Sequence, residues 1–156
     1  MSTVVSAVPG CSTMILPATW RDFNIIRQIE HICFPRDAWP FWDIFSVLTL
    51  PNVVRLKAVC NSQTVGFIAS DVRPVEKMAW IATICVLPEF RQRGIGTALL
   101  HACEGRINLP SMRLNVRASN ETAVRLYKNL GYSQIGVWPR YYQDGEDALI
   151  LEKRLY

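Results

Sequence analysis

The sequence predicts one α/β domain in which helices flank a mixed central sheet. Three observations lead to this prediction. First, segments with apolar residues at helical spacing alternate along the chain with segments in which every second residue is apolar. Second, the chain has 156 residues, half of them apolar and 19% charged, which suits one globular domain and leaves no room for two. Third, no internal repeat or linker divides the chain.

The N-terminal segment, residues 1–12, carries no charged side chain and lacks the basic start and long apolar centre of a secretory signal. We expect a mobile tail there, followed by a single domain over residues 13–156. No apolar run reaches the ~18 residues that a membrane-spanning helix needs, so we expect no membrane association. The five cysteines are odd in number and form no C-x-x-C pair or metal-like cluster. We therefore expect reduced, buried thiols, no bound metal and a cytoplasmic location.

The charge of the chain is modest. Seventeen basic residues against thirteen acidic residues give a formal net charge of +4. The basic residues are scattered and form no stripe interleaved with aromatic residues, so we expect no nucleic-acid partner. A small positive excess suits an anionic ligand.

Two helices are predicted first. Thr19 and Asp22 resemble a capping box, and the apolar residues behind them recur at helical spacing, which predicts a helix over residues 19–33. A second, shorter helix is predicted over residues 41–48, ended by a Pro-Asn pair. Its three aromatic residues indicate either core packing, which we favour, or a wall of a ligand site.

Three strands follow, over about residues 53–60, 63–72 and 78–87. The first alternates apolar and basic residues, as a half-buried strand does. The third is apolar almost without a break, which suits a central strand covered on both faces. The remaining predicted elements are, in order, a helix over residues 95–103, a strand over 112–117, a helix over 123–130, and strands over 132–137 and 147–153. Gly131 lies where a C-terminal helix cap belongs.

The most informative stretch follows the strand over residues 78–87 and reads Arg91-Gln92-Arg93-Gly94-Ile95-Gly96-Thr97 at the start of a helix. A helix N-terminus exposes unpaired N–H groups, two glycines let a phosphate approach the backbone, and arginines add charge. We interpret the stretch as a cradle for a diphosphate; the alternative is a tight turn flanked by solvated arginines. It lacks the Gly-Lys-Ser/Thr of a triphosphate loop and the third glycine of a dinucleotide fingerprint.

The cradle motif and two later motifs together resemble the GCN5-related N-acetyltransferase (GNAT) superfamily over about residues 15–155. The motifs are Arg91-x-x-Gly94-x-Gly96, Asn115-Val116-Arg117-Ala118-Ser119-Asn120 and Leu126-Tyr127-x-x-Leu130-Gly131-Tyr132. With Arg140-x-Tyr142 and Glu146-Asp147-Ala148, they are most similar to the RimI-type enzymes, which acetylate the N-terminal alanine of a ribosomal protein. The resemblance implies a GNAT-like domain with a mostly antiparallel sheet, an enzyme that uses acetyl-CoA as cosubstrate, and a protein or peptide N-terminus as partner.

The resemblance also implies roles for particular residues. The implied cofactor contacts are Ile84, Cys85, Val86, Arg91, Gln92, Arg93, Gly94, Ile95, Gly96, Thr97 and Asn120, the first three through their backbone. Tyr127 corresponds to the general acid that protonates the leaving thiolate. The residues alone leave a second interpretation open for two of these positions, because Asn120 also suits a helix cap and Tyr127 also suits core packing.

Asn115 departs from the RimI-type pattern, which has a glutamate base at this strand position, and an amide does not accept a proton near neutral pH. A free α-amine, with a pKa of about 7.7–8.0, is roughly one tenth neutral at pH 7, whereas a lysine amine is only about 0.04% neutral. We therefore expect an α-amine acceptor, with a water chain or a carboxylate of Asp71, Glu76 or Glu146 relaying the proton. Asn115 either orients the acceptor amine or is a solvated polar position.

Two other functions stay open at this stage: acetylation of a small-molecule amine, and a non-catalytic acyl-CoA-binding module. The aromatic and basic loop over residues 138–142 either closes over a peptide acceptor or anchors itself to the core. His31 and His101 stand without partner spacing, and we do not expect them to be catalytic. Both a monomer and a homodimer fit the sequence.

Overall fold

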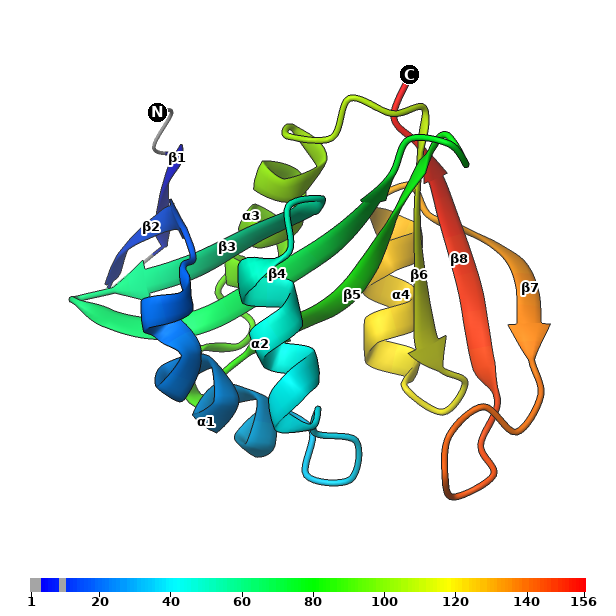
Figure 1. Cartoon of the computed structure of the whole chain (residues 1–156), viewed down its shortest axis with the longest axis horizontal. Coiled ribbons are helices and arrows are strands. Elements are labelled where there is room, and N and C mark those ends of the chain that lie inside the picture. The colour runs from blue at the N-terminus through cyan, green and yellow to red at the C-terminus, as the bar shows by residue number, and fades with distance from the viewer. Residues whose placement is uncertain (1–3, 9–10) are drawn as a thin grey trace. The chain divides into compact units, whose positions relative to one another are not determined.

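A computed structural model describes residues 4–8 and 11–156 of the chain (Figure 1). The described residues fall into two compact units. The first unit holds the described residues up to Val72 together with Ala82–Ile107, and the second holds Arg73–Ile81 together with Asn108–Tyr156. Strand β5 (Met78–Val86) contributes residues to both units, because the boundary between the units falls between Ile81 and Ala82.

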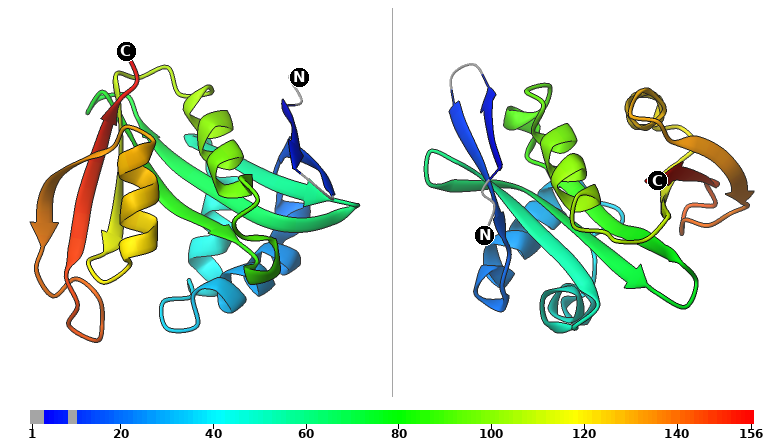
Figure 2. Two further views of the ribbon diagram at one scale, coloured as in Figure 1. Left: turned by 180° about the vertical axis from the view of Figure 1, so that it is seen from behind. Right: turned by 90° about the horizontal axis from the view of Figure 1, so that it is seen from above.

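The first unit is a sheet with helices on both faces. Its strands β1 (Val4–Val8), β2 (Cys11–Pro17), β3 (Val53–Cys60) and β4 (Gln63–Arg73) pair antiparallel in chain order. Its helices are α1 (Phe23–Cys33), α2 (Phe41–Thr49) and α3 (Ile95–Glu104), with short 3-10 helices at Trp20–Asp22 and Pro88–Phe90. Helices α1 and α2 cover one face of these strands and α3 covers the other (Figure 2).

Local sequence signals account for the start of the first helical segment. The Thr19 side chain accepts a hydrogen bond from the Arg21 N–H, and the Thr19 N–H donates to Asp22 at 2.9 Å. Helix α1 then turns Ile26 and Ile29 into the core, where both are fully buried. The predicted capping box and the predicted helix over residues 19–33 are therefore confirmed, with a 3-10 turn at the N-terminal end.

Gly66 in β4 allows a close approach of neighbouring elements in the first unit. A Cβ atom at this position would lie 3.0 Å from the Cys85 carbonyl oxygen and 3.1 Å from Cδ1 of Leu99. Only a residue without a side chain leaves room for β5 and α3 at these distances. The glycine thus fixes where the C-terminal half of β5 and the following helix lie.

The second unit has the strand order β5-β6-β8-β7, starting from the residues of β5 that belong to it. Strand β6 (Ser111–Arg117) runs parallel to β5, whereas β8 (Ala148–Arg154) is antiparallel to both β6 and β7 (Ser133–Trp138). Helix α4 (Glu121–Asn129) lies against this sheet. The buried side chains of the unit include Met112, Leu114, Tyr127, Tyr132 and Leu151. Gly131 follows α4 with φ of 95°, so the predicted glycine cap is confirmed.

The predicted α/β class with a mixed, mostly antiparallel sheet is confirmed by these pairings. Three narrower expectations are corrected. The segment over residues 1–12, expected to be a tail, contains β1, which pairs with β2 from Val4↔Ile15 to Val8↔Cys11. Its lack of charge, taken as the sign of a tail, is equally compatible with an edge strand. Residues 1–3 and 9–10 lie outside the described residues.

The second correction concerns the cysteines, which were all expected to be reduced. Cys11 and Cys60 form a disulfide between the adjacent strands β2 and β3, while Cys33, Cys85 and Cys103 are free thiols. The sequence holds no local sign of this pair, because 49 residues separate its members and only the register of β2 on β3 brings them together.

The third correction concerns the aromatic residues of α2, for which core packing was favoured. Phe41, Trp42 and Phe45 are all exposed, and Trp42 keeps 71% of its surface in contact with solvent. Their rings pack on one another, and Phe41 also contacts Phe23 of α1 at a centroid distance of 4.7 Å.

Within the described residues, no helix is both long and apolar enough to cross a membrane.

Candidate active site

The turn between β5 and α3, in the first unit, presents open backbone at the N-terminus of a helix. Gln92 and Gly94 have φ of 61° and 76°, which turns the chain sharply into α3. Gly94 is the N-cap residue, and no side chain caps the helix there. A Cβ at Gly94 would meet nothing within 4 Å, and one at Gly96 would meet only the Val86 side chain, at 3.8 Å. The first N–H groups of α3 therefore face space that an anion can enter.

The side chains of this turn differ in what they can offer a ligand. Arg91 and Arg93 are exposed, which suits contact with an anion. The Arg91 Nε–H already donates to the Val86 carbonyl at 2.9 Å, and the Arg93 guanidinium lies 5.3 Å from the Phe90 ring centroid. Ile95, predicted as a cofactor contact, turns its side chain into the core, so only its backbone is available to a ligand.

The C-terminal half of β5 holds the predicted pantetheine contacts, Ile84, Cys85 and Val86. The Cys85 side chain is buried, while the side chains of Ile84 and Val86 on either side of it are half-buried. Thr83, on the same strand face as Cys85, donates a hydrogen bond to Glu30 Oε1 of α1 at 2.5 Å. Burial raises the pKa of the Glu30 carboxyl above its usual value, against the opposing effect of the Thr83 hydrogen bond.

Glu30 is a feature that the sequence did not predict. It lies on α1 with only 1% of its surface exposed, and Oε2 has no hydrogen-bond partner among the described residues. A glutamate within an amphipathic helix ordinarily faces solvent, so periodicity gives no sign of its burial. Its partner Thr83 lies 53 residues further along the chain.

In the second unit, Asn115 of β6 lies between two aromatic side chains. The Trp80 indole N–H donates to Asn115 Oδ1 at 3.4 Å, and Asn115 Nδ2 donates to the Tyr142 hydroxyl at 3.5 Å. Asn115 is half-buried, so it is not simply a solvated position. These two contacts fix the direction in which the amide points, which favours the interpretation that it orients another polar group. Sequence reasoning missed the contribution of Trp80.

Glu146, one of the carboxylates considered as a proton relay, is held in its charged form. Its Oε1 accepts the Ser119 N–H at 2.8 Å, and its Oε2 accepts from Arg117 Nη1 at 2.7 Å. Hydrogen bonds from Ser119, through its side chain and its backbone, together with the Arg117 guanidinium, lower the pKa of Glu146 to about 2. A carboxylate with so low a pKa is a weak base, so Glu146 is a poor proton acceptor near neutral pH.

The other two relay candidates occupy different surroundings. Glu76 is exposed and pairs with Arg73 at 3.6 Å, in the second unit. Asp71 lies half-buried on β4 in the first unit, opposite Val53 of β3.

Helix α4 carries the last two predicted site residues. Asn120 is the N-cap of α4, and its Oδ1 accepts the Ala123 N–H at 3.2 Å, so the capping interpretation is confirmed. The Tyr127 side chain is 8% exposed and packs edge-to-face on Tyr132, with ring centroids 5.9 Å apart. Tyr127 therefore contributes to the packing of the second unit through its contact with Tyr132.

The loop after β7 is anchored at one end and open at the other. Trp138 stacks on Trp80 with ring planes 4° apart and centroids at 5.3 Å. Tyr141 contacts both Trp138 and Tyr142, yet half of its own surface is exposed. The Arg117 guanidinium covers the Tyr142 ring at 4.0 Å. Trp138 is thus held by its stack on Trp80 but is itself 41% exposed and lies outside the core, while Tyr141 remains available for contact with a ligand.

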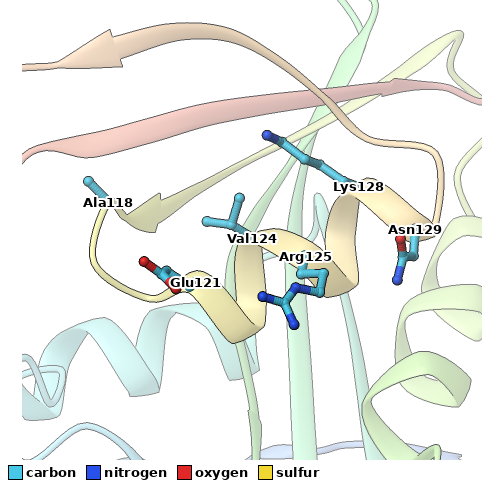
Figure 3. A pocket seen from close by; sticks show the side chains of 6 residues that line it. All are labelled: Ala118, Glu121, Val124, Arg125, Lys128 and Asn129. Atoms are coloured by element: carbon cyan, nitrogen blue, oxygen red, sulfur yellow. The ribbon is translucent and has the colours of Figure 1, made fainter.

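An open, shallow pocket of about 370 Å³ is lined by residues of α4 and of the turn before it (Figure 3). It is lined by Ala118, Glu121, Val124, Arg125, Lys128 and Asn129. No residue predicted for the site lines it. The predicted residues themselves divide between the units: those from Ile84 to Thr97 lie in the first, and Asn115, Asn120 and Tyr127 lie in the second.

The fold and these motifs define an N-acetyltransferase of the GNAT type. Residues 18–132 match the model of the acetyltransferase (GNAT) family, which is most of the chain, so the protein belongs to that family.

Relatives named as N-alpha-acetyltransferase or alanine N-acetyltransferase match most of the chain. An N-alpha-acetyltransferase from Sulfurisphaera tokodaii is 30% identical over 159 residues, covering 93% of this chain and 95% of the relative. The [ribosomal protein bS18]-alanine N-acetyltransferase from Salmonella typhimurium is 31% identical over 146 residues, covering 90% and 91% of the two chains. The crystal structure of the ribosomal-protein-S18-alanine N-acetyltransferase from Escherichia coli superposes with a TM-score of 0.82, at 26% identity and over 92% and 94% of the two chains.

Proposed function

We propose that this protein transfers the acetyl group of acetyl-CoA to the free α-amine of a protein or peptide. The observation that carries the proposal is the open turn at Gly94 and Gly96, where helix N–H groups face space free of side chains. Membership of the acetyltransferase family and the relatives named for α-amine acetylation support the same reaction.

The residues of the first unit would hold acetyl-CoA, which supplies the acetyl group as a thioester. We propose that the backbone from Gln92 to Thr97 binds the diphosphate, with Arg91 and Arg93 adding positive charge beside it. We further propose that the backbone of Ile84, Cys85 and Val86 hydrogen-bonds the pantetheine arm. Since the Ile95 side chain is buried, its contribution is limited to the N–H group.

In the second unit, the proposed catalytic groups are Tyr127 and Asn115. The Tyr127 hydroxyl would donate the proton that the departing thiolate needs. Its packing on Tyr132 is compatible with this role, because edge-to-face contact holds the ring in place. Asn120 uses Oδ1 for its helix cap, so we assign its cofactor contact to Nδ2.

Asn115 would orient the acceptor amine rather than deprotonate it. The Trp80 indole N–H donates to its Oδ1, and the Tyr142 hydroxyl accepts from its Nδ2, so the amide is held between two fixed rings. Without a base at this position, the reaction depends on the fraction of amine that is already neutral. That fraction is roughly one tenth for an α-amine at pH 7 and about 0.04% for a lysine, which favours an N-terminus.

A pair of matched peptides tests the proposal. One peptide begins with a free alanine, and the other has the same sequence with a blocked N-terminus and an added lysine; thiol release from acetyl-CoA is followed at pH 7. We expect the free N-terminus to react at least tenfold faster. Equal or faster turnover of the blocked peptide would refute the α-amine preference, and no thiol release with either peptide would count against transferase activity on peptides.

A further inference from the structure

Two of the three free thiols lie together in the first unit, beside the residues proposed to bind acetyl-CoA. Cys33 is the last residue of α1 and is half-buried, whereas Cys85 of β5 is 5% exposed. Cys33 Sγ contacts the carbonyl of Val86, the residue after Cys85, and Cys85 Sγ lies 4.0 Å from Oε1 of Glu30, which is one helical turn before Cys33. The third free thiol, Cys103 of α3, is fully buried, and burial raises its pKa to about 12.

Cys33 and the Arg91 guanidinium share one hydrogen-bond acceptor. The Cys33 thiol donates to the Val86 carbonyl at 3.3 Å, and the Arg91 Nε–H donates to the same oxygen at 2.9 Å. The guanidinium and the sulfur therefore meet at one carbonyl. The hydrogen bond from Cys85, followed by the Arg91 guanidinium, lowers the pKa of Cys33 to about 7, against burial and the Glu30 charge.

Cys85 has the opposite character and a proton acceptor beside it. The hydrogen bond with Cys33 and burial raise the pKa of Cys85 well above its usual value, so it stays a thiol. That thiol lies 4.0 Å from Glu30 Oε1, and the Glu30 Oε2 atom has no partner among the described residues. A carboxylate in this place can take the proton when Cys85 reacts.

We propose that Cys33 and Cys85 form an oxidation site for small hydroperoxides, in which Cys33 reacts first and Cys85 resolves the product as a disulfide. Cys33 is half-buried and is therefore the thiol that a small oxidant can reach, whereas the buried Cys85 lies on the strand that the Cys33 sulfur contacts. An accessible thiol beside a second, resolving thiol is a common arrangement in reversible cysteine oxidation.

The two steps balance with hydrogen peroxide as the oxidant. The Cys33 thiolate attacks one peroxide oxygen, the O–O bond breaks, and hydroxide leaves, giving a sulfenic acid. Cys85 then passes its proton to the Glu30 carboxylate, its sulfur attacks the Cys33 sulfur, and hydroxide leaves with that proton as water. Overall, two thiols and one hydrogen peroxide give one disulfide and two waters.

The disulfide would tie the end of α1 to β5, the strand proposed to carry the pantetheine arm. The site itself does not depend on that proposal, because the contacts of Cys33 with Val86 and of Cys85 with Glu30 form without any ligand. A test that reads only the state of the sulfurs can therefore succeed or fail independently of acetyl-CoA binding.

The test is disulfide mapping of the full chain after brief exposure to a small excess of hydrogen peroxide at pH 7. Tryptic cleavage separates the relevant cysteines, with Cys33 in residues 28–36 and Cys85 in residues 78–91. We expect these two peptides to become linked while Cys103 keeps its thiol. Absence of the link, oxidation of Cys103 before Cys33, or a Cys33 sulfinic acid beside an intact Cys85 thiol would each overturn the proposal.

Single substitutions distinguish the first oxidation step, at Cys33, from the second, at Cys85. Cys33→Ser should abolish the link and leave Cys85 reduced, whereas Cys103→Ser should leave the yield of the link unchanged. Glu30→Gln should slow the second step, so that a sulfenic acid accumulates at Cys33 and is trapped by a dimedone reagent. In the unmodified protein, alkylation of Cys33 should rise with pH around 7; a midpoint at about 8.5, the value of an ordinary thiol, would contradict the assignment.

Discussion

Replacement of Gly66 by alanine should destabilise the protein, by an amount that follows from the space around it. The added Cβ would lie 3.0 Å from the Cys85 carbonyl oxygen, which is backbone, and 3.1 Å from Leu99 Cδ1. Overpacking of this kind costs about 1–3 kcal/mol. Alanine also restricts the unfolded chain more than glycine does, and this effect stabilises the folded state by about 0.4–1 kcal/mol. At the midpoints of these two ranges, the net loss of unfolding free energy is about 1.3 kcal/mol.

Thermal unfolding followed by circular dichroism measures this loss. At about 2–4 °C per kcal/mol for a chain of this size, Gly66→Ala should lower Tm by roughly 3–5 °C. Gly136→Ala is the matched control, because a Cβ on Gly136 of β7 would meet nothing within 4 Å and its φ is not positive. Its Tm should change little or rise slightly. Equal shifts in the two variants, or a Gly66→Ala protein as stable as the wild type, would refute the reasoning.

Three further predictions concern the proposed catalytic residues and their neighbours. If Asn115 supplies no base, kcat/KM for an α-amine should rise about tenfold per pH unit and level off near pH 8. Asn115→Glu should then raise kcat/KM at pH 7 by up to about tenfold, with little gain at pH 9. Tyr127→Phe should retain the packing on Tyr132, and hence Tm, while lowering kcat by about 100-fold or more; an unchanged kcat would exclude Tyr127 as the acid. Glu146→Gln should lower Tm at pH 6. Because folding lowers the pKa of Glu146 from 4.5 to about 2, that difference should shrink as the pH falls from 4.5 towards 2, and a gap that persists at pH 2 would contradict the role of its charge.

Local signals in the sequence predicted the elements whose residues interact with near neighbours. The Thr19 and Asp22 capping box, the turn at Gly94 and the cap at Gly131 all depend on contacts within a few residues, and all three are present in the structure. The alternation of apolar residues likewise predicted strands at β3 and β6, because one face of each is buried.

Features that depend on distant pairs escaped prediction. Glu30 and Thr83 are 53 residues apart, and a glutamate in a helix gives no sign of burial. The Cys11–Cys60 disulfide depends on the register between β2 and β3. The indole of Trp80 reaches Asn115 only because β5 and β6 are paired in parallel. In each case, the tertiary arrangement decides which side chains meet, and single-residue patterns do not encode it.

Binding of coenzyme A to the full chain, measured by isothermal titration calorimetry, tests the diphosphate cradle most directly. Dephospho-CoA retains the diphosphate, whereas pantetheine lacks it. We predict that CoA and dephospho-CoA bind with similar affinity and that pantetheine binds at least tenfold more weakly. No heat with CoA, or pantetheine binding as tightly as CoA, would contradict the assignment of the turn at Gly94 and Gly96.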